Sequence, residues 1–336
     1  MQIKKIKLPL FIGLTVLSLC FYSCSEDTIT DILEEEALDD NNGEDDSSDV
    51  LELDTDFIIN EDRTFINYIL PESTYNSFLD PDDYGDFSIV SKKVYEHFND
   101  EFDFIFVLSN EETKPDGLYY GVSFSVQNHV KGIGSNIYSN TDRYGSAGKL
   151  KSVLHMPRTE YIKSGPFLHE IAHYWGNHGF IETTVGGHWG FSSIGGQLGG
   201  FNELTDLGSS TYKAAISGKS SFGTFANGGN SVPYGNAELY IMGLINESEL
   251  EDIKIAKNPQ WGDKAGEFTA DEIVTLTSSD IVAQHGKREP SSANSQKEFK
   301  AIAIVVSKEK LSGDKKAKIH QDIENFIKVN PLTIVL

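Results

Sequence analysis

The sequence predicts an α+β domain over residues 55–336, with a strand-containing first half and a loop-rich, partly helical second half. The apolar run Phe102–Ser109, rich in aromatic and β-branched residues, is typical of a buried strand. Residues 166–176 instead place their apolar side chains at helical spacing. The glycine-dense segments 186–200 and 222–236 then predict tight turns and close backbone approach.

Four elements are expected in the first half of this domain. Ser88–Asn99 has helical spacing, and the buried strand Phe102–Ser109 follows it. Leu118–Val126 contains aromatic and β-branched residues and predicts a second strand. Lys149–Met156 alternates weakly between polar and apolar residues and stops at Pro157, which indicates a strand at the edge of a sheet.

The segment after this strand is expected to be an amphipathic helix. Pro166 suits the first turn of a helix, and Gly176 suits its end. Four residues between them follow the spacing of a buried helical face: Leu168, Ile171, Ala172 and Trp175. The other side of this helix is therefore available to face a cleft.

Four further elements are expected after the glycine-dense segments. Asn236 is a suitable cap for a helix at Ala237–Leu244. A second helix is expected at residues 270–277, a strand at Phe299–Ser307, and an amphipathic helix at residues 314–328. The sequence shows no internal repeat and no segment typical of a transmembrane span.

The predicted amphipathic helix carries an H-E-x-x-H motif, His169-Glu170-Ile171-Ala172-His173. Residues four apart lie on one face of a helix, so His169 and His173 can offer two imidazole nitrogens to one zinc ion. Glu170 lies beside that position, where its carboxylate can take a proton from a zinc-activated water. The motif therefore predicts a catalytic Zn²⁺ site with Glu170 as general base. Such a site requires a third protein ligand from elsewhere in the chain.

The stretch around His169 resembles the active-site helix of zincin metallopeptidases. Gly176, three residues after His173, is similar to the Gly of the metzincin pattern H-E-x-x-H-x-x-G-x-x-H. That pattern places its third His where this chain has Gly179, and His178 is one residue early. The resemblance implies a zincin-like fold: a mixed sheet with the active-site helix in an upper subdomain, and a loop-rich, helical lower subdomain. In that family an edge strand pairs with an extended peptide substrate.

His188 is the predicted third zinc ligand. It lies fifteen residues after His173, in a glycine-rich segment that can turn back under the helix. Three alternatives remain open: His178, Glu182 and Glu238. His178 lies near the end of the helix, and Glu238 would come from a second helix. The position of Glu182 resembles that of the third ligand in zincins that use a Glu shortly after the motif.

Four other residues are considered for roles near such a zinc site. His155 falls in the strand at residues 149–156 and is expected to be an ordinary strand residue. Tyr234 and Tyr240 are both candidate donors to a transition-state oxyanion, and the sequence selects neither. Met242 invites comparison with the metzincin Met-turn, but it falls inside a predicted helix and is expected to pack in the core.

Residues 1–24 have the features of a bacterial lipoprotein signal peptide. Three lysines precede an apolar stretch, residues 8–19, that is too short to span a bilayer comfortably. Residues 21–24, Phe-Tyr-Ser-Cys, resemble a lipobox, so lipid attachment is expected at Cys24. Cys20 is the weaker candidate because a bulky Leu precedes it. With one Cys left after cleavage, no disulfide framework is possible.

The formal net charge of −23 is concentrated near the N-terminus. Residues 25–60 contain 15 acidic residues and neither Lys nor Arg. We therefore expect residues 25–54 to be a flexible acidic tether between the lipid and the domain. Acidic residues after the lipidated Cys, as in Ser25-Glu26-Asp27, resemble a surface-export signal of some Gram-negative bacteria. This balance argues against nucleic acid as a partner.

These features predict a zinc-dependent endopeptidase, lipid-anchored through Cys24 at the bacterial outer membrane or cell surface. Its substrate is expected to be a peptide or protein. The alternative is a surface lipoprotein that binds a glycan or a host protein and uses a zincin-like fold as a scaffold. The presence of Glu170 favours the enzyme, because a binding protein has no need of that carboxylate.

Overall fold

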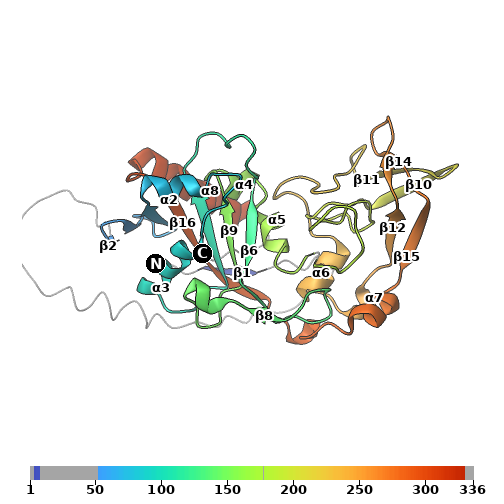
Figure 1. Ribbon diagram of the computed structural model, residues 1–336, viewed down its shortest axis with the longest axis horizontal. Helices are drawn as coiled ribbons and strands as arrows, with labels where there is room; N and C mark the ends of the chain where they lie inside the picture. The colour runs from blue at the N-terminus through green and yellow to red at the C-terminus, as the bar shows by residue number, and fades with distance from the viewer. Residues whose placement is uncertain (1–3, 8–51, 177, 330–336) are drawn as a thin grey trace, which may run out of the picture.

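The first half of the chain and its C-terminal part contribute the strands of one eight-stranded mixed sheet (Figure 1). The structure is a computed structural model that describes residues 4–7, 52–176 and 178–329. The strands of this sheet are β1 (Lys4–Lys7), β2 (Glu52–Asp54), β3 (Phe57–Ile59), β4 (Ile66–Ile69), β5 (Phe104–Ser109), β6 (Val122–Ser125), β9 (Ser152–Met156) and β16 (Glu298–Ser307). Their order is β2-β3-β4-β16-β5-β9-β6, and β1 pairs with β16 beside this path.

Helices pack on both faces of this sheet and also lie beyond it (Figure 1). They are α2 (Glu72–Ser77), α3 (Ser88–His97), α4 (Tyr161–Ser164), α5 (Phe167–Ala172), α6 (Asn236–Met242), α7 (Ser278–His285) and α8 (Gly313–Val329). Short 3₁₀ helices occur at Thr141–Tyr144, Glu247–Glu249 and Ser292–Asn294. The α+β class with a mixed sheet is thus confirmed. Among the described residues, no helix has the length and apolar character needed to cross a membrane.

Alternating side chains of the central strands enter two separate apolar layers. In β5, Phe104 and Phe106 belong to the layer that contains residues of α5 and α8. Ile105 and Val107 belong to the opposite layer, which contains residues of α2 and α3. Because β5 lies between two parallel neighbours and is buried on both faces, it reads as a continuous apolar run, as the sequence predicts.

The predicted edge strand is in fact interior, which corrects the sequence-based expectation. β9 lies between β5, to which it is parallel, and β6, to which it is antiparallel, and all five of its residues are buried. Its weak alternation arises because the polar residues Ser152 and His155 are buried too. Pro157 follows the last paired residue of β9, so its missing N–H removes no ladder bond. The edge of the sheet on this side is β6.

A second expectation fails at residues 270–277, where the structure has a strand rather than a helix. β15 (Glu272–Leu276) pairs antiparallel with β12 (Ile253–Lys257). Its consecutive β-branched residues favour an extended backbone, which explains the difference. The helix begins only after Thr277, whose side chain accepts a hydrogen bond from the backbone N–H of Asp280 and caps α7.

The other predicted elements are present, although β6 and α5 are each several residues shorter than predicted. The strands β5, β6 and β16 and the helices α3, α5, α6 and α8 all fall within the predicted ranges or within one residue of them. The helix α6 begins at Asn236 rather than after it. The side chain of Asn236 does not cap the helix but bonds to the backbone of Glu249 and Glu251.

Residues 178–297, here called the loop subdomain, form the part of the molecule beyond α5 (Figure 1). Its strands are β10 (Glu203–Gly208), β11 (Thr211–Ala215), β12 (Ile253–Lys257), β13 (Gln260–Trp261), β14 (Glu267–Thr269) and β15 (Glu272–Leu276); β7 (Gln127–Asn128) and β8 (Tyr138–Ser139) form a separate pair earlier in the chain. A cluster of aromatic residues supports the four-stranded sheet β10-β11-β14-β13. The helix α5 therefore lies where the large sheet meets the loop subdomain.

Two N-terminal predictions fall largely beyond the described part of the chain. Cys24 and residues 25–51 of the expected tether lie outside the described residues. Of the expected signal peptide, the structure describes only Lys4–Lys7, which form β1 beside the start of β16. Lipid attachment and the flexible tether therefore stay predictions.

Candidate metal centre

The helix α5 places the H-E-x-x-H motif between the core and the loop subdomain. Its apolar side chains Leu168 and Ile171 are buried in the layer below the large sheet, as the helical spacing predicts. The helix ends at Ala172, and His173 is its C-terminal cap. Gly176 follows close to Leu198, where a β-carbon would lie 2.3 Å from the Leu198 side chain. The loop subdomain therefore packs tightly against the end of this helix.

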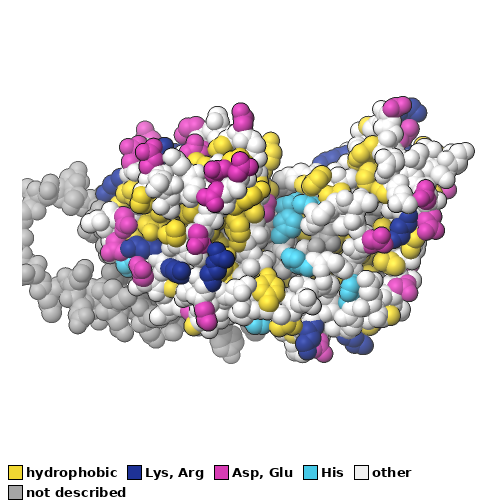
Figure 2. Space-filling model, in the orientation of Figure 1, with side chains coloured by type: hydrophobic (Ala, Val, Ile, Leu, Met, Phe, Trp, Pro, Cys, Tyr) yellow, Lys and Arg dark blue, Asp and Glu magenta, His cyan; other side chains and the backbone are white. Residues whose placement is uncertain are grey.

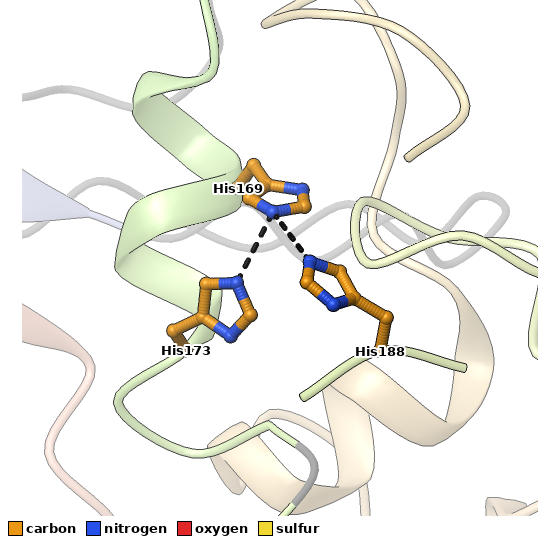
Figure 3. Close-up of side chains that lie close together, drawn as sticks. All are labelled: His169, His173 and His188. Atoms are coloured by element: carbon orange, nitrogen blue, oxygen red, sulfur yellow. Dashed lines mark hydrogen bonds between the residues drawn. The ribbon is translucent and has the colours of Figure 1, made fainter. Parts of the chain in front are cut away.

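Three histidine side chains converge at this helix: His169, His173 and His188 (Figure 3). The Nε2 atoms of His169 and His173 are 3.1 Å apart, and those of His169 and His188 are 3.3 Å apart. His169 lies on α5, His173 is the C-terminal cap of that helix, and His188 reaches them from the glycine-rich segment of the loop subdomain. The structure thus brings the three predicted ligand residues together.

In two of the three histidine rings, the hydrogen bond made by Nδ1 determines whether Nε2, the nitrogen that faces the other histidines, carries a proton. His169 Nδ1 lies 2.8 Å from the backbone carbonyl oxygen of Gln197, and His188 Nδ1 lies 2.8 Å from that of Gly186. A carbonyl oxygen only accepts, so each Nδ1 is the donor and carries the ring proton. In the neutral rings the Nε2 atoms of His169 and His188 are then unprotonated, with lone pairs that face each other.

This arrangement fits a cation better than it fits a hydrogen bond. Two ring nitrogens bound at about 2.0–2.1 Å to a tetrahedral zinc ion would lie roughly 3.3–3.4 Å apart, close to the two separations seen. A direct hydrogen bond between His169 and His188 would need one of these two rings to be protonated, but burial lowers the pKa of His169 to about 4 and also lowers the pKa of His188. Neutral imidazoles with an outer hydrogen-bond partner are the usual zinc ligands. The donor set therefore fits zinc.

Glu170 is buried on the same helix but is not among the described side chains that converge on this point. It is 4% exposed, and burial raises the pKa of its carboxyl group to about 8. The residue that covers it is Gly121, directly before the edge strand β6. A β-carbon on Gly121 would lie 2.6 Å from Glu170 Oε1, so only glycine allows this approach. Glu170 is thus confined between its helix and the start of the edge strand.

The raised pKa of Glu170 gives the first prediction, a pH-dependent stability in protein treated with a chelator. A folded-state pKa of about 8, above the ordinary value of 4.5, contributes stability that is present below about pH 4.5 and is lost as the pH rises through 8. Gln at this position does not ionise. The melting temperature of Glu170→Gln minus that of the wild type should therefore grow from pH 5 to pH 8 and then level off. Glu203→Gln, at an exposed carboxylate, is the matched control. A constant or shrinking difference would contradict the burial argument.

Glu238 lies outside the histidine cluster, and sequence reasoning missed the hydrogen bonds that it makes. Its carboxylate is fully buried and accepts four hydrogen bonds. The donors are Trp189 Nε1 and the backbone N–H groups of Gln197, Leu198 and Gly235, at 2.8–3.0 Å. Four donors to two oxygens indicate a carboxylate that acts only as acceptor.

These bonds connect both sides of the histidine cluster. Trp189 directly follows His188 in the chain, and Gln197 supplies the carbonyl oxygen that orients His169. Gly196 passes so close that a β-carbon there would lie 2.0 Å from Glu238 Oε2. Glu238 is therefore a positioning residue for the loop that surrounds the histidines.

The second prediction follows from this position. In Glu238→Gln one acceptor oxygen becomes an NH₂ group that faces N–H donors, so the loop loses hydrogen bonds on at least one side of the cluster. Zinc affinity, measured by competition with a chromophoric chelator, should fall by roughly 10- to 100-fold. Asn67→Ala is the control, because Asn67 is buried and hydrogen-bonded between β4 and β16. It should destabilise the fold without changing zinc affinity. Unchanged affinity in Glu238→Gln would contradict the assigned role.

The two remaining ligand alternatives lie outside the cluster. His178 is exposed, and its Nε2 lies 2.9 Å from the backbone carbonyl oxygen of His173, to which it donates. Glu182 is exposed and forms an ion pair with Lys257. The three side chains that the sequence left open as alternatives to His188 thus all have other partners.

Three of the four other residues compared with active-site roles, His155, Tyr234 and Tyr240, make structural contacts. His155 is fully buried between Ser109 Oγ and the Tyr119 hydroxyl, at 2.8 and 2.7 Å. Tyr234 donates from its hydroxyl to the backbone carbonyl oxygen of Leu168, at 2.9 Å. The ring of Tyr240 packs in the core near Phe180. Among the described residues, neither tyrosine hydroxyl is hydrogen-bonded to a histidine of the cluster.

A second group of potential ligand atoms lies at the opposite end of the large sheet. Asp54, Glu96 and His97 place their ligand atoms within 4.8 Å of one another. The ammonium group of Lys93 forms an ion pair with Asp54 and lies 3.5 Å from Glu96. Because this lysine already supplies the positive charge, the histidine cluster is the stronger metal site.

Two contacts of the site have no recognisable signal in the sequence. Gln197 and Gly121 act through their backbones, one by its carbonyl oxygen and the other by the absence of a side chain.

Comparisons with protein-family models, with curated proteins and with solved structures find no match for this chain.

Proposed function

We propose that this chain is a zinc-dependent endopeptidase in which His169, His173 and His188 hold the metal. The observation that carries the proposal is the convergence of three imidazole Nε2 atoms beside a buried glutamate on the same helix. In two of the three rings the outer hydrogen bond places the ring proton on Nδ1, so the inward Nε2 carries a lone pair that a metal could accept. Three protein ligands would leave a coordination position open to water and substrate, which is typical of catalytic zinc rather than structural zinc.

Glu170 is the proposed general base. When bound, zinc supplies Lewis-acid polarisation of a carbonyl oxygen and lowers the pKa of a water molecule. The Glu170 carboxylate takes a proton from the attacking water and passes it to the nitrogen of the leaving amine. A base works best when its pKa lies near the working pH, and burial moves the pKa of Glu170 in that direction. Bound Zn²⁺ opposes that shift, because a nearby cation favours the ionised carboxylate.

The edge strand β6 supports a peptide as the substrate. Among the described residues, β6 pairs within the large sheet on one side, with β9. A free strand edge offers backbone N–H and C=O groups to an extended peptide. Because Gly121 at the start of this strand touches Glu170, a peptide aligned along β6 would pass beside the proposed base. We propose that this corresponds to the zincin-like arrangement, with β6 in the role that was expected from the sequence for the strand at residues 149–156. Anchoring through Cys24 at the outer membrane or cell surface is part of the same proposal.

The third prediction tests this function directly. The full chain should bind about one zinc ion per molecule, measured by elemental analysis, and should cleave peptides in an unbiased library, measured by mass spectrometry. A chelator should stop cleavage, and added zinc should restore it. A protein that gains no thermal stability from zinc, or that cleaves no peptide when zinc is bound, would contradict the proposal.

A further inference from the structure

Two residues with exposed aromatic side chains are close to the site: Phe225 packs against His188, and Tyr120 directly precedes the glycine that covers Glu170. Large hydrophobic side chains are exposed at seven described positions: Tyr84, Ile89, Tyr120, Ile137, Leu207, Phe225 and Trp261. Of these, Phe225 directly contacts a residue of the cluster, and Tyr120 precedes the glycine that covers Glu170. Figure 2 shows histidine side chains at the surface between the two halves of the molecule, with hydrophobic side chains on either side.

Phe225 belongs to the glycine-dense segment 222–236 of the loop subdomain. Its ring centroid lies 5.1 Å from that of His188, with an angle of 60° between the two planes. The side chain is nevertheless 60% exposed. A molecule held at the cluster would therefore meet apolar surface on the His188 side.

Tyr120 belongs to the other half of the molecule. Its ring lies 5.9 Å from that of Tyr161, and the ammonium group of Lys114 is 5.1 Å from its centroid. The side chain is 63% exposed. Since the next residue, Gly121, touches Glu170, this second apolar surface lies on the Glu170 side of the site. Both rings are supported by neighbours, so little conformational freedom is lost when a ligand covers them.

We propose that the substrates are extended peptides with bulky apolar side chains on both sides of the scissile bond, one packed on Tyr120 and one on Phe225. This inference rests on the proposed endopeptidase function and names its substrate class. Burial of the exposed rings against aromatic or branched aliphatic side chains removes apolar area from water on both partners. Polar, glycine-rich or strongly charged peptides offer no such area and are poor substrates.

The first test is the cleavage pattern of the full chain loaded with zinc on a peptide library derived from a whole proteome. Mass spectrometry of the products should show Phe, Tyr, Leu, Ile and Met enriched at positions next to the cleaved bonds. Cleavage without this enrichment would overturn the substrate class while the proposed function stands. Absence of any cleavage by the zinc-loaded chain would overturn the function and this inference together.

The second test uses Tyr120→Ala and Phe225→Ala with two synthetic peptides, one with apolar residues at the positions next to the cleaved bond and one with Ala there. Each variant should lower kcat/KM for the apolar peptide by about tenfold or more, mainly through KM, with a much smaller effect on the Ala peptide. Leu207→Ala, at an exposed apolar residue of β10, should leave both values unchanged. Zinc content is measured for every variant, because Phe225 touches His188. Equal losses on both peptides at full zinc content would overturn the assignment of these residues.

Discussion

Replacement of Glu170 by Gln is expected to lower peptide hydrolysis by roughly 10²- to 10⁴-fold while zinc stays bound. The amide has nearly the shape of the carboxylate, but it cannot accept a proton from water. Because Glu170 does not converge with the three histidines, its loss removes no proposed ligand. The measurement compares kcat/KM of the two proteins at equal zinc content. Gln also suits the buried position, which is only 4% exposed.

The matched control for this experiment is Glu182→Gln, which changes an exposed glutamate that pairs with Lys257. It should retain wild-type kcat/KM. Near-normal turnover in Glu170→Gln would show that the proton is taken by another group or that the reaction needs no base. Loss of zinc in the same variant would instead show that Glu170 belongs to the ligand set.

Substitution of His188 by Ala is expected to produce the largest loss of zinc affinity outside the motif itself. It removes one of three proposed nitrogen ligands, and a protein zinc site has an apparent binding free energy of about 10–16 kcal/mol. An affinity loss on the order of a thousandfold is therefore expected, measured by competition with a chelator of known affinity. The fold should survive, since the ring of His188 is only partly buried at the surface of the loop subdomain.

His178→Ala is the comparison that makes this result specific. His178 lies in the same stretch of chain and bonds to the His173 carbonyl oxygen, but its ring is exposed and outside the cluster. Its removal should change zinc affinity less than about threefold, a difference typical of a lost surface hydrogen bond. Wild-type affinity in His188→Ala, or a larger loss in His178→Ala, would refute the proposed ligand set.

The elements that could be predicted from sequence are those with an uninterrupted period. Phe102–Ser109 is apolar throughout because β5 is covered on both faces, and α5 shows a single apolar stripe because only one of its faces meets the core. The predicted position of a strand in the sheet was wrong where polar residues are buried. Ser152 and His155 are polar yet buried, so β9 has the sequence pattern of an edge strand while it occupies the interior.

The sequence predicted those parts of the site that depend on the identity of side chains. H-E-x-x-H fixes two histidines and a glutamate by helix geometry, and a glycine-rich approach made His188 the preferred third residue. The hydrogen bonds that orient these rings come from backbone carbonyl groups, which every residue possesses. Glu238 has the sequence signature of a first-turn helix residue, and its contacts with Trp189 and Leu198 depend on tertiary packing alone.

The buried carboxylate of Glu238 has a consequence for the order of folding and metal uptake. In small zinc-dependent domains the metal itself holds the loops, and the apoprotein is unfolded. Here four protein N–H groups hold the loop through Glu238, and backbone carbonyl groups hold the rings of His169 and His188. The chain can therefore complete its fold before the proposed zinc ion binds, so that metal uptake would follow folding rather than drive it.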